Sequence, residues 1–241
     1  MNIEKPSYIF TYSIVMVLLV AITLTVVAVQ LKPAQDNNIR IEKMQNILSS
    51  INIKTTPKDA EEFYKKYIVE TIVINDKGEV QTNIKAFDVD LAAEIKKMDK
   101  SKRLLPVYIA KMEDGSIAKV LPMRGKGLWG PIWGYISVKE DLSTVIGTMF
   151  DHKGETPGLG AEISLEIFQK QFIGKKILDE GGKFVSIKVQ KGGAPKNDLH
   201  AVDAISGGTI TSNGVTAMLS DCLSLYASYI ASYKSSNQKE Q

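Results

Sequence analysis

PSYIFTYSIVMVLLVAITLTVVAVQL, residues 6–31, contains no charged side chain and is dominated by Ile, Val, Leu and Ala. Its apolar part, residues 8–31, is long enough to cross about 30 Å of hydrocarbon at about 1.5 Å per helical residue. A secretory signal peptide has a shorter apolar region and a small-x-small cleavage site, whereas this stretch ends in Val29-Gln30-Leu31. We therefore favour an uncleaved membrane anchor over a cleaved signal peptide or a buried helix.

The composition argues against several classes of function. The 241 residues include 30 basic and 27 acidic side chains, giving a net charge of +3 that is too weak and dispersed for a nucleic-acid-binding surface. Cys222 is the single cysteine, so an intrachain disulfide or a four-thiolate centre from this chain alone is excluded. His152 and His200 are the two histidines, and we expect no metal site. The motifs of hydrolases, P-loop proteins and zinc proteases do not occur, so we assign no catalytic residue.

The domain organisation follows from the apolar stretch and the polar segments that flank it. We expect one folded domain after the anchor, because the remaining length and apolar content suit a single core. The expected segments are an N-terminal tail at 1–7, a transmembrane helix at 8–31, a linker at 32–38, a folded domain at 39–234 and a polar C-terminal tail at 235–241.

The hydrophobic periodicity of the domain indicates an α+β fold. Strands come in runs joined by tight turns such as Asn75-Asp76-Lys77-Gly78 and Glu113-Asp114-Gly115, with helices around them. The predicted helices are a docking helix around 41–51, then 59–67, 89–98, 161–172 and a long C-terminal helix through 215–230. The predicted strands are 68–74, 79–84, 106–112, 117–122, 133–138, 145–150 and 183–189.

Three glycine-rich stretches lie at the edges of predicted elements: residues 125–130, 156–160 and 206–212. Each one alone is typical of a turn, because glycine adopts positive φ at little cost. The third precedes the C-terminal helix, with Thr211 or Ser212 as the expected N-cap. Free backbone N–H groups and the positive end of the helix dipole would stabilise a phosphate there. Phosphate binding and simple helix capping both remain open on this physical argument.

The segment Asp203-Ala204-Ile205-Ser206-Gly207-Gly208-Thr209 resembles the flavinylation motif D-x-x-S-G-A-T, with Gly208 where the motif has Ala. Four further stretches match in order, so the chain resembles, over nearly its whole length, the C subunits of sodium-translocating NADH:quinone reductases. The matching stretches are Gly127-Leu128-Trp129 with Gly134-Tyr135, Glu155-Thr156-Pro157-Gly158-Leu159-Gly160, Lys191-Gly192-Gly193-Ala194-Pro195 and Thr211-Ser212-Asn213-Gly214-Val215.

The resemblance implies an FMN joined to Thr209 by a phosphoester and attached by a separate flavin transferase. The cofactor would carry the chemistry as single-electron transfer, so no acid–base pair is expected. The residues implied to bind FMN besides Thr209 are Asp203, Ser206, Gly207, Gly208, Thr211, Thr156, Gly158, Leu159, Gly160, Gly127, Leu128, Trp129 and Lys191. Without the resemblance, Trp129 and Leu159 would be taken as ordinary core residues.

The resemblance also implies an electron-relay subunit of an NADH:ubiquinone reductase that transports sodium, without a complete active site on this chain. NADH would bind another subunit, and the partners would be membrane subunits that carry flavin and an iron–sulfur centre. The location implied is the bacterial inner membrane, with the domain on the periplasmic side; the charges flanking the span are too balanced to decide the orientation. Two alternatives remain: the flavinylated G subunit of the related ferredoxin-oxidising complex, and a membrane-tethered scaffold without a redox role.

Overall fold

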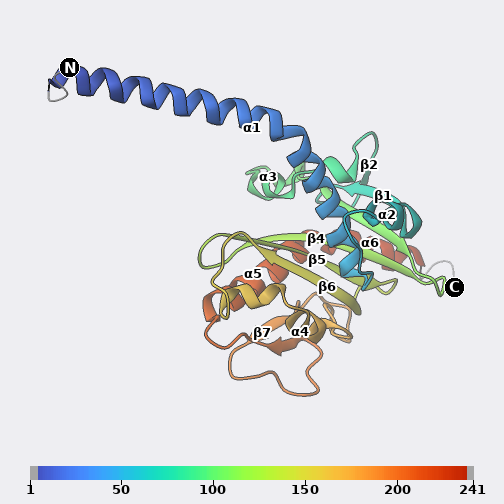
Figure 1. The fold of residues 1–241 in the computed structure, drawn as a ribbon. Coiled ribbons are helices and arrows are strands. Elements are labelled where there is room, and N and C mark those ends of the chain that lie inside the picture. Colours follow the sequence, from blue (N-terminus) through green and yellow to red (C-terminus); the bar gives the residue numbers. More distant parts are fainter. Residues whose placement is uncertain (1–4, 238–241) are drawn as a thin grey trace. The chain divides into compact units, whose positions relative to one another are not determined.

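A computed structural model describes residues 5–237 of the chain (Figure 1). The chain forms two compact units, residues 1–43 and residues 44–241. The first consists of most of helix α1 (Pro6–Ser50), and the second contains the end of α1 and every later element. A long apolar N-terminal helix with an α+β domain is the fold class expected from the sequence, which is thereby confirmed. Residues 1–4 and 238–241, parts of the two predicted tails, lie outside the described residues.

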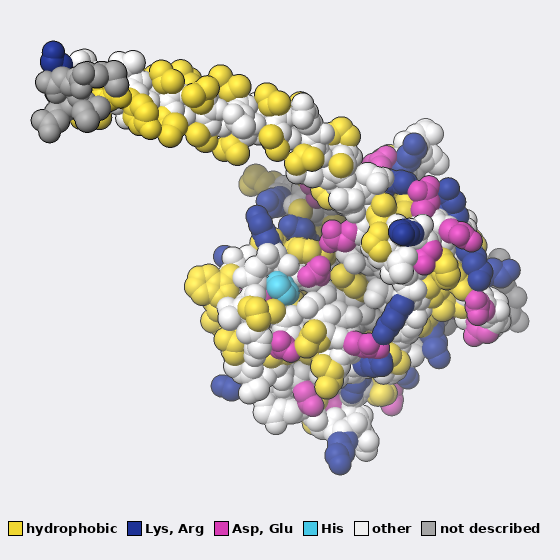
Figure 2. All heavy atoms as spheres, in the orientation of Figure 1, with side chains coloured by type: hydrophobic (Ala, Val, Ile, Leu, Met, Phe, Trp, Pro, Cys, Tyr) yellow, Lys and Arg dark blue, Asp and Glu magenta, His cyan; other side chains and the backbone are white. Residues whose placement is uncertain are grey.

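Helix α1 contains the apolar stretch that begins the sequence. Figure 2 shows hydrophobic side chains along its visible face. Within the part of the chain that the structure describes, it is the one helix long and apolar enough to be a candidate membrane span. Residues 32–38, expected as a linker, are helical, and Lys32 and Asp36 form an ion pair of 2.7 Å one turn apart. The second unit begins at Met44, five residues after the predicted domain boundary of 39.

The second unit combines one antiparallel sheet of six strands with short helices. The sheet has the order β2-β1-β3-β4-β5-β6, and a separate parallel pair joins β7 to β8. The strands are β1 (Ile68–Ile74), β2 (Val80–Gln81), β3 (Leu105–Lys111), β4 (Ile117–Lys126), β5 (Pro131–Lys139), β6 (Val145–His152), β7 (Lys188–Gln190) and β8 (Ala201–Asp203). The α-helices are α2 (Ala60–Tyr67), α3 (Leu91–Lys96), α4 (Glu166–Gln169), α5 (Thr209–Leu225) and α6 (Ala227–Asn237). The 3₁₀ helices are η1 (Ala86–Asp88), η2 (Lys100–Lys102), η3 (Gly160–Ser164) and η4 (Lys170–Phe172).

The tight turns of the sheet form where their sequences predict them. Asn75 Oδ1 accepts hydrogen bonds from the backbone N–H groups of Lys77 and Glu79, and Gly78 has a φ of +81°. Asp114 Oδ1 similarly accepts from the N–H of Ser116 at 2.9 Å in the β3–β4 turn. Side-chain oxygens that mimic a backbone turn therefore fix the hairpins.

Both faces of the sheet are buried by other elements. Because consecutive residues of a strand point to opposite sides, neighbours in a strand belong to different core clusters. On one face Val107 and Leu121 belong to a core cluster that includes Val215 and Leu219 of α5. On the other face their chain neighbours Tyr108 and Val120 lie in a second cluster, together with residues 47–51 around the C-terminal end of α1. The docking helix expected around 41–51 is thus the last part of α1.

Four predicted elements differ in the structure. The long C-terminal helix predicted through 215–230 is interrupted at Tyr226, where α5 ends and after which α6 begins. The predicted helix at 161–172 is divided into η3, α4 and η4, because Leu165 has extended backbone angles (φ −80°, ψ 142°). Of the strand predicted at 183–189, only the last two residues lie in β7, since Ser186 has a φ of 64° and interrupts the extended run. The strand predicted at 79–84 is limited to Val80–Gln81, and Asn83 likewise has a positive φ of 69°.

Candidate functional site

The three glycine-rich stretches meet at one end of the sheet. The first, 125–130, ends in the β4–β5 turn at 127–130, and the second, 156–160, belongs to the segment 153–160 that follows β6. The third, 206–212, begins in the segment 204–208 that leads into α5 and ends in the first turn of that helix. Trp129 N–H donates to Glu155 Oε1 at 2.8 Å, and Thr211 Oγ1 donates to Glu155 Oε2 at 2.5 Å. Predicted site residues that lie more than 80 positions apart in the sequence are therefore joined through one carboxyl group.

Glu155 connects two of these stretches, and sequence reasoning did not include it among the site residues. Its side chain is 5 % exposed, and its backbone N–H donates to His152 Nδ1 at 3.1 Å. A Cβ at Gly127 would lie 2.5 Å from Glu155 Oε1, and one at Gly160 would collide with Glu155 Oε2 and with Thr211 Oγ1. The available sequence signal was the position of Glu155 at the head of the Glu-Thr-Pro-Gly-Leu-Gly run, but an isolated acid has no local partner that would identify it.

Helix α5 begins earlier than the capping pattern predicts. Thr209 is its first residue, Gly208 is the N-cap, and the first backbone bond of the helix runs from Ser212 N–H to Gly208 O at 2.9 Å. The prediction of Thr211 or Ser212 as N-cap is therefore wrong: the Thr211 hydroxyl is used by Glu155, and Ser212 Oγ accepts from Ile205 N–H at 3.2 Å. The N–H groups of the first helical residues precede this bond and form the positive end of the helix dipole, beside the half-buried Thr209.

The chain approaches α5 through a close contact with Leu159. Gly207 has a φ of +74°, and a Cβ there would lie 2.5 Å from Leu159 Cδ2. Gly208 has a φ of −98°, but a Cβ there would lie 3.0 Å from Ile205 Cγ2. Ser206 and Gly207 are exposed while Gly208 is buried, so the loop presents its backbone to solvent directly before the helix.

Large apolar side chains are exposed around this loop. Leu128 is 47 % exposed, Trp129 is 69 % exposed and Leu159 is 42 % exposed. The interpretation of Trp129 and Leu159 as ordinary core residues is therefore wrong. Exposed apolar surface beside a helix N-terminus is a combination suited to a ligand that carries both a planar ring system and an anionic group.

The remaining predicted residues lie at the margin of this cluster. Thr156 and Gly158 are exposed, and Thr156 O accepts from the N–H groups of Leu159 and Ala161 at 3.1 and 3.2 Å. Asp203 is held on the β7–β8 side, where its Oδ1 accepts from Ala194 N–H at 2.7 Å and its N–H donates to Gln171 Oε1 at 2.9 Å.

Lys191 directly follows Gln190, which pairs with Asp203 across β7 and β8. The structure thus places Lys191 beside Asp203, at the other end of the segment that leads to α5. The side chain of Lys191 is exposed. Asp203 forms its hydrogen bonds with Ala194 of the 191–195 loop and with Gln171, and not with the glycine-rich turn at 127–130.

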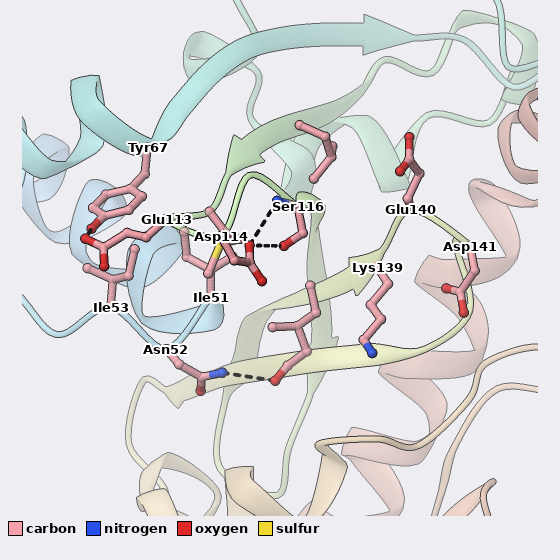
Figure 3. A pocket seen from close by; sticks show the side chains of 13 residues that line it. Ile51, Asn52, Ile53, Tyr67, Glu113, Asp114, Ser116, Lys139, Glu140 and Asp141 are labelled. Carbon is pink, nitrogen blue, oxygen red and sulfur yellow. Dashed lines mark hydrogen bonds between the residues drawn. The ribbon is translucent and has the colours of Figure 1, made fainter.

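A cavity of about 840 Å³ lies at the opposite end of the sheet (Figure 3). It is lined by the β3–β4 and β5–β6 turns and by residues 51–53. Figure 3 shows Tyr67 hydrogen-bonded to Glu113, and Asp114 bonded to Ser116. Asp141 accepts from the N–H groups of Ser143 and Thr144 at 2.8 Å each. Glu140 accepts from the Tyr233 hydroxyl at 3.3 Å. All four carboxylates of this cavity thus have partners within the fold, and the glycine-rich site remains the stronger candidate.

Comparison with known proteins identifies the same region. The sequence profile of the FMN-binding domain family matches residues 127–224, which contain the second and third stretches and residues 127–130 of the first. The chain is 36% identical over 212 residues to the C subunit of the Na⁺-translocating NADH-quinone reductase of Vibrio vulnificus, covering 82% of this chain and 83% of that protein. It is 32% identical over 228 residues to the corresponding C subunit of Haemophilus ducreyi, covering 89% of this chain and 88% of the relative.

Solved structures agree with the sequence relatives. The crystal structure of the C subunit of the Na⁺-translocating NADH-quinone reductase from Parabacteroides distasonis superposes with a TM-score of 0.76 at 42% identity, covering 83% of this chain and 96% of that one. The Shewanella oneidensis NqrC structure superposes with a TM-score of 0.70 at 27% identity, covering 81% of this chain and 98% of that one. With relatives above 30% identity aligned over more than two thirds of its length, the chain belongs to the family of Na⁺-translocating NADH-quinone reductase C subunits, which carry an FMN-binding domain.

Proposed function

We propose that this chain is an electron-relay subunit of a sodium-translocating NADH:quinone reductase complex and that its FMN is attached to Thr209 through a phosphoester. The observation that carries the proposal is the position of Thr209, a half-buried hydroxyl residue at the first position of α5 in a chain of this family. The family match supports FMN as the cofactor, and the helix N-terminus supports a phosphate at this position.

The residues around Thr209 fit the phosphate and ribityl end of FMN. A phosphate on the Thr209 oxygen would meet the N–H groups that precede the first backbone bond of α5. Gly207, with its positive φ and no side chain, lets the backbone approach this group closely. Ser206 is exposed next to it and offers a further hydroxyl donor.

The ring system of FMN would lie against the exposed apolar side chains of Leu128, Trp129 and Leu159. Gly158 is exposed and permits close backbone contact with the ring, while Gly160 is buried against Glu155 and Thr211. Thr156 and Lys191 offer polar groups at the margin. When bound, the flavin supplies one-electron chemistry, and the protein holds it, orients it and limits its access to water. Such a role needs no nucleophile or acid–base pair from this chain.

The anchor supports a place in a membrane complex. Helix α1 is a candidate span without a charged residue between positions 6 and 31, so it offers no path for sodium, and translocation would take place in other subunits. We propose neighbouring membrane subunits with flavin and iron–sulfur centres as the redox partners and a flavin transferase for maturation. The domain would face the periplasm of a bacterial inner membrane.

Denaturing electrophoresis under ultraviolet light tests the attachment. The full chain, expressed with a flavin transferase, should give a fluorescent band at its mass of 26.5 kDa. Thr209→Val should remove the fluorescence and the mass of the added FMN. Thr82→Val provides a matched control at an exposed turn far along the sequence and should keep both. Fluorescence that persists in Thr209→Val but disappears in Ser206→Ala would move the attachment to the neighbouring hydroxyl and refute the proposal.

Protease protection in intact spheroplasts tests the orientation. A periplasmic domain is accessible to added protease and should be digested without detergent. A domain that resists digestion until the membrane is dissolved would lie on the cytoplasmic side, in contradiction to the proposed orientation.

A further inference from the structure

Glu155 is a buried acid held without the usual cationic partner. Within residues 5–237 two carboxyl groups are buried, those of Glu94 and Glu155. Glu94 pairs with Lys97 Nζ at 2.7 Å, whereas the partners found for Glu155 are the Trp129 N–H and the Thr211 hydroxyl. Removing a carboxylate from water costs several kcal/mol, and well-packed apolar residues often serve stability better. A stabilising role alone therefore does not explain the choice of Glu at this position.

The two oxygens of Glu155 join segments that are distant in the sequence. Oε1 accepts from the turn between β4 and β5, 26 positions earlier, and Oε2 accepts from the first turn of α5, 56 positions later. The bond from the Glu155 N–H to His152 Nδ1 fixes the backbone from which the side chain extends. One side chain thereby fixes the exposed Trp129 relative to the helix that starts at Thr209.

The packing around the carboxyl group leaves no freedom for another arrangement. Gly127 and Gly160 border its two oxygens so closely that a Cβ at either position would overlap an oxygen atom. The hydroxyl of Thr211 is itself buried, with 2 % exposure. Both glycines and Thr211 belong to the residues predicted for the site, yet their contacts here are with Glu155.

We propose that Glu155 is the positioning residue of the flavin site. Through its hydrogen bonds it fixes the loop that carries Leu128 and Trp129 against the N-terminus of α5. The apolar surface proposed for the flavin ring is thereby held at one distance from the phosphate site proposed at Thr209. This inference rests on the proposed function. It assigns Gly127, Gly160 and Thr211 to the support of the site, and it leaves Thr209, Gly207 and the exposed apolar side chains to contact the cofactor.

Replacement by Gln separates the hydrogen bonds from the charge. The Trp129 N–H can only donate, so the Gln oxygen would turn toward it. The Gln NH₂ group would then face Thr211 Oγ1, which can rotate its hydrogen away and accept. Glu155→Gln therefore keeps both links in the same space without a negative charge, whereas Glu155→Ala removes both links.

The experiment follows flavin attachment in the full chain, co-expressed with an inducible flavin transferase, from the rate at which fluorescence appears at 26.5 kDa. Visible circular dichroism of the attached FMN and its midpoint potential are measured on the purified membrane protein. Glu155→Ala should slow attachment about tenfold or more, since misplacement by about 1 Å can cost 10²-fold, and should weaken the flavin dichroism. Glu155→Gln should restore both toward the wild type.

Thr211→Val removes one link and keeps the side chain of Glu155, so it tests the same arrangement if Glu155→Ala does not fold. Its flavin dichroism should be weaker than that of Glu155→Gln. Wild-type attachment and dichroism in Glu155→Ala would overturn the inference, as would a Glu155→Gln protein impaired to the same degree as Glu155→Ala. A wild-type chain that takes up no flavin would instead refute the proposed function, so the two failures are distinguishable.

Discussion

Thr211→Val should destabilise the domain by removing one of the two hydrogen bonds that Glu155 accepts. The Thr211 hydroxyl is 2 % exposed and donates to Oε2 at 2.5 Å, and valine keeps the volume of the side chain but cannot donate. A hydrogen bond to a charged group contributes about 1.5–3 kcal/mol, and the loss leaves a buried oxygen without this donor. We expect a loss of about 2 kcal/mol in the free energy of unfolding, or about 4–8 °C in Tm for a unit of this size.

Thermal unfolding of the protein expressed without a flavin transferase measures this loss, because a bound cofactor would add its own stabilisation. Thr82→Val, at an exposed turn, is the matched control and should change stability by less than about 0.5 kcal/mol. Thr211→Ser keeps the donor and should lose only the contribution of one methyl group, about 0.8 kcal/mol.

A double-mutant cycle assigns the loss to the contact itself. In a Glu155→Ala background the acceptor is absent, so Thr211→Val should cost less than about 0.5 kcal/mol there, and the coupling energy should exceed about 1 kcal/mol. Equal losses in both backgrounds would show that the hydroxyl acts independently of Glu155, which would refute the reasoning.

Three further predictions concern the core and the loop before α5. Gly207→Ala should lower the free energy of unfolding by about 1–2 kcal/mol because the φ of Gly207 is +74°, whereas Gly208→Ala, at a φ of −98°, should change it by less than about 1 kcal/mol. Denaturant midpoints compare the two variants, and equal losses would contradict the role of the positive φ at Gly207. Burial raises the pKa of the Cys222 thiol to about 11, so at pH 8 the protonated thiol should react with a disulfide reagent only after denaturant is added. Rapid labelling of the native protein would contradict this prediction. Lys119 Nζ is buried 3.3 Å from the centroid of the Tyr233 ring, so Tyr233→Leu should lower the free energy of unfolding by about 2 kcal/mol, measured by calorimetry. Adding Lys119→Met to this variant should recover part of the lost stability. An unchanged Tm in Tyr233→Leu would argue against the contact.

Much of the fold follows from local sequence signals. The apolar stretch, the hairpin turns at Asn75 and Asp114 and the run of strands from β3 to β6 each depend on residues close in the chain, and the structure bears them out. The elements around 161–190 could not be predicted in the same way. There the predicted helix is interrupted at Leu165 and the predicted strand at Ser186, and neither residue type is a typical helix or strand terminator.

The site was predictable in part for the same reason. The motif ending at Thr209 and the glycine-rich stretches are visible as patterns, and the structure brings the stretches at 127–130, 153–160 and 204–208 together. The start of α5 was misplaced because local capping rules favour Thr211, whereas its hydroxyl is used by a partner 56 positions away. For Glu155 the sequence offered only its place at the head of the Glu-Thr-Pro-Gly-Leu-Gly run, since its contacts are with residues 26 and 56 positions away.

The long-range contacts of Glu155 also determine when the site can form during synthesis of the chain. The bonds of Glu155 reach 26 residues back and 56 residues forward, so the second of them can form only after α5 has been synthesised. Contacts between distant residues carry the larger cost of loop closure and tend to form late in folding. A nascent chain that ends before residue 209 lacks Thr209, the proposed attachment residue, and the contacts of α5 around it. If FMN is attached there as proposed, its attachment follows synthesis and folding of this part of the domain.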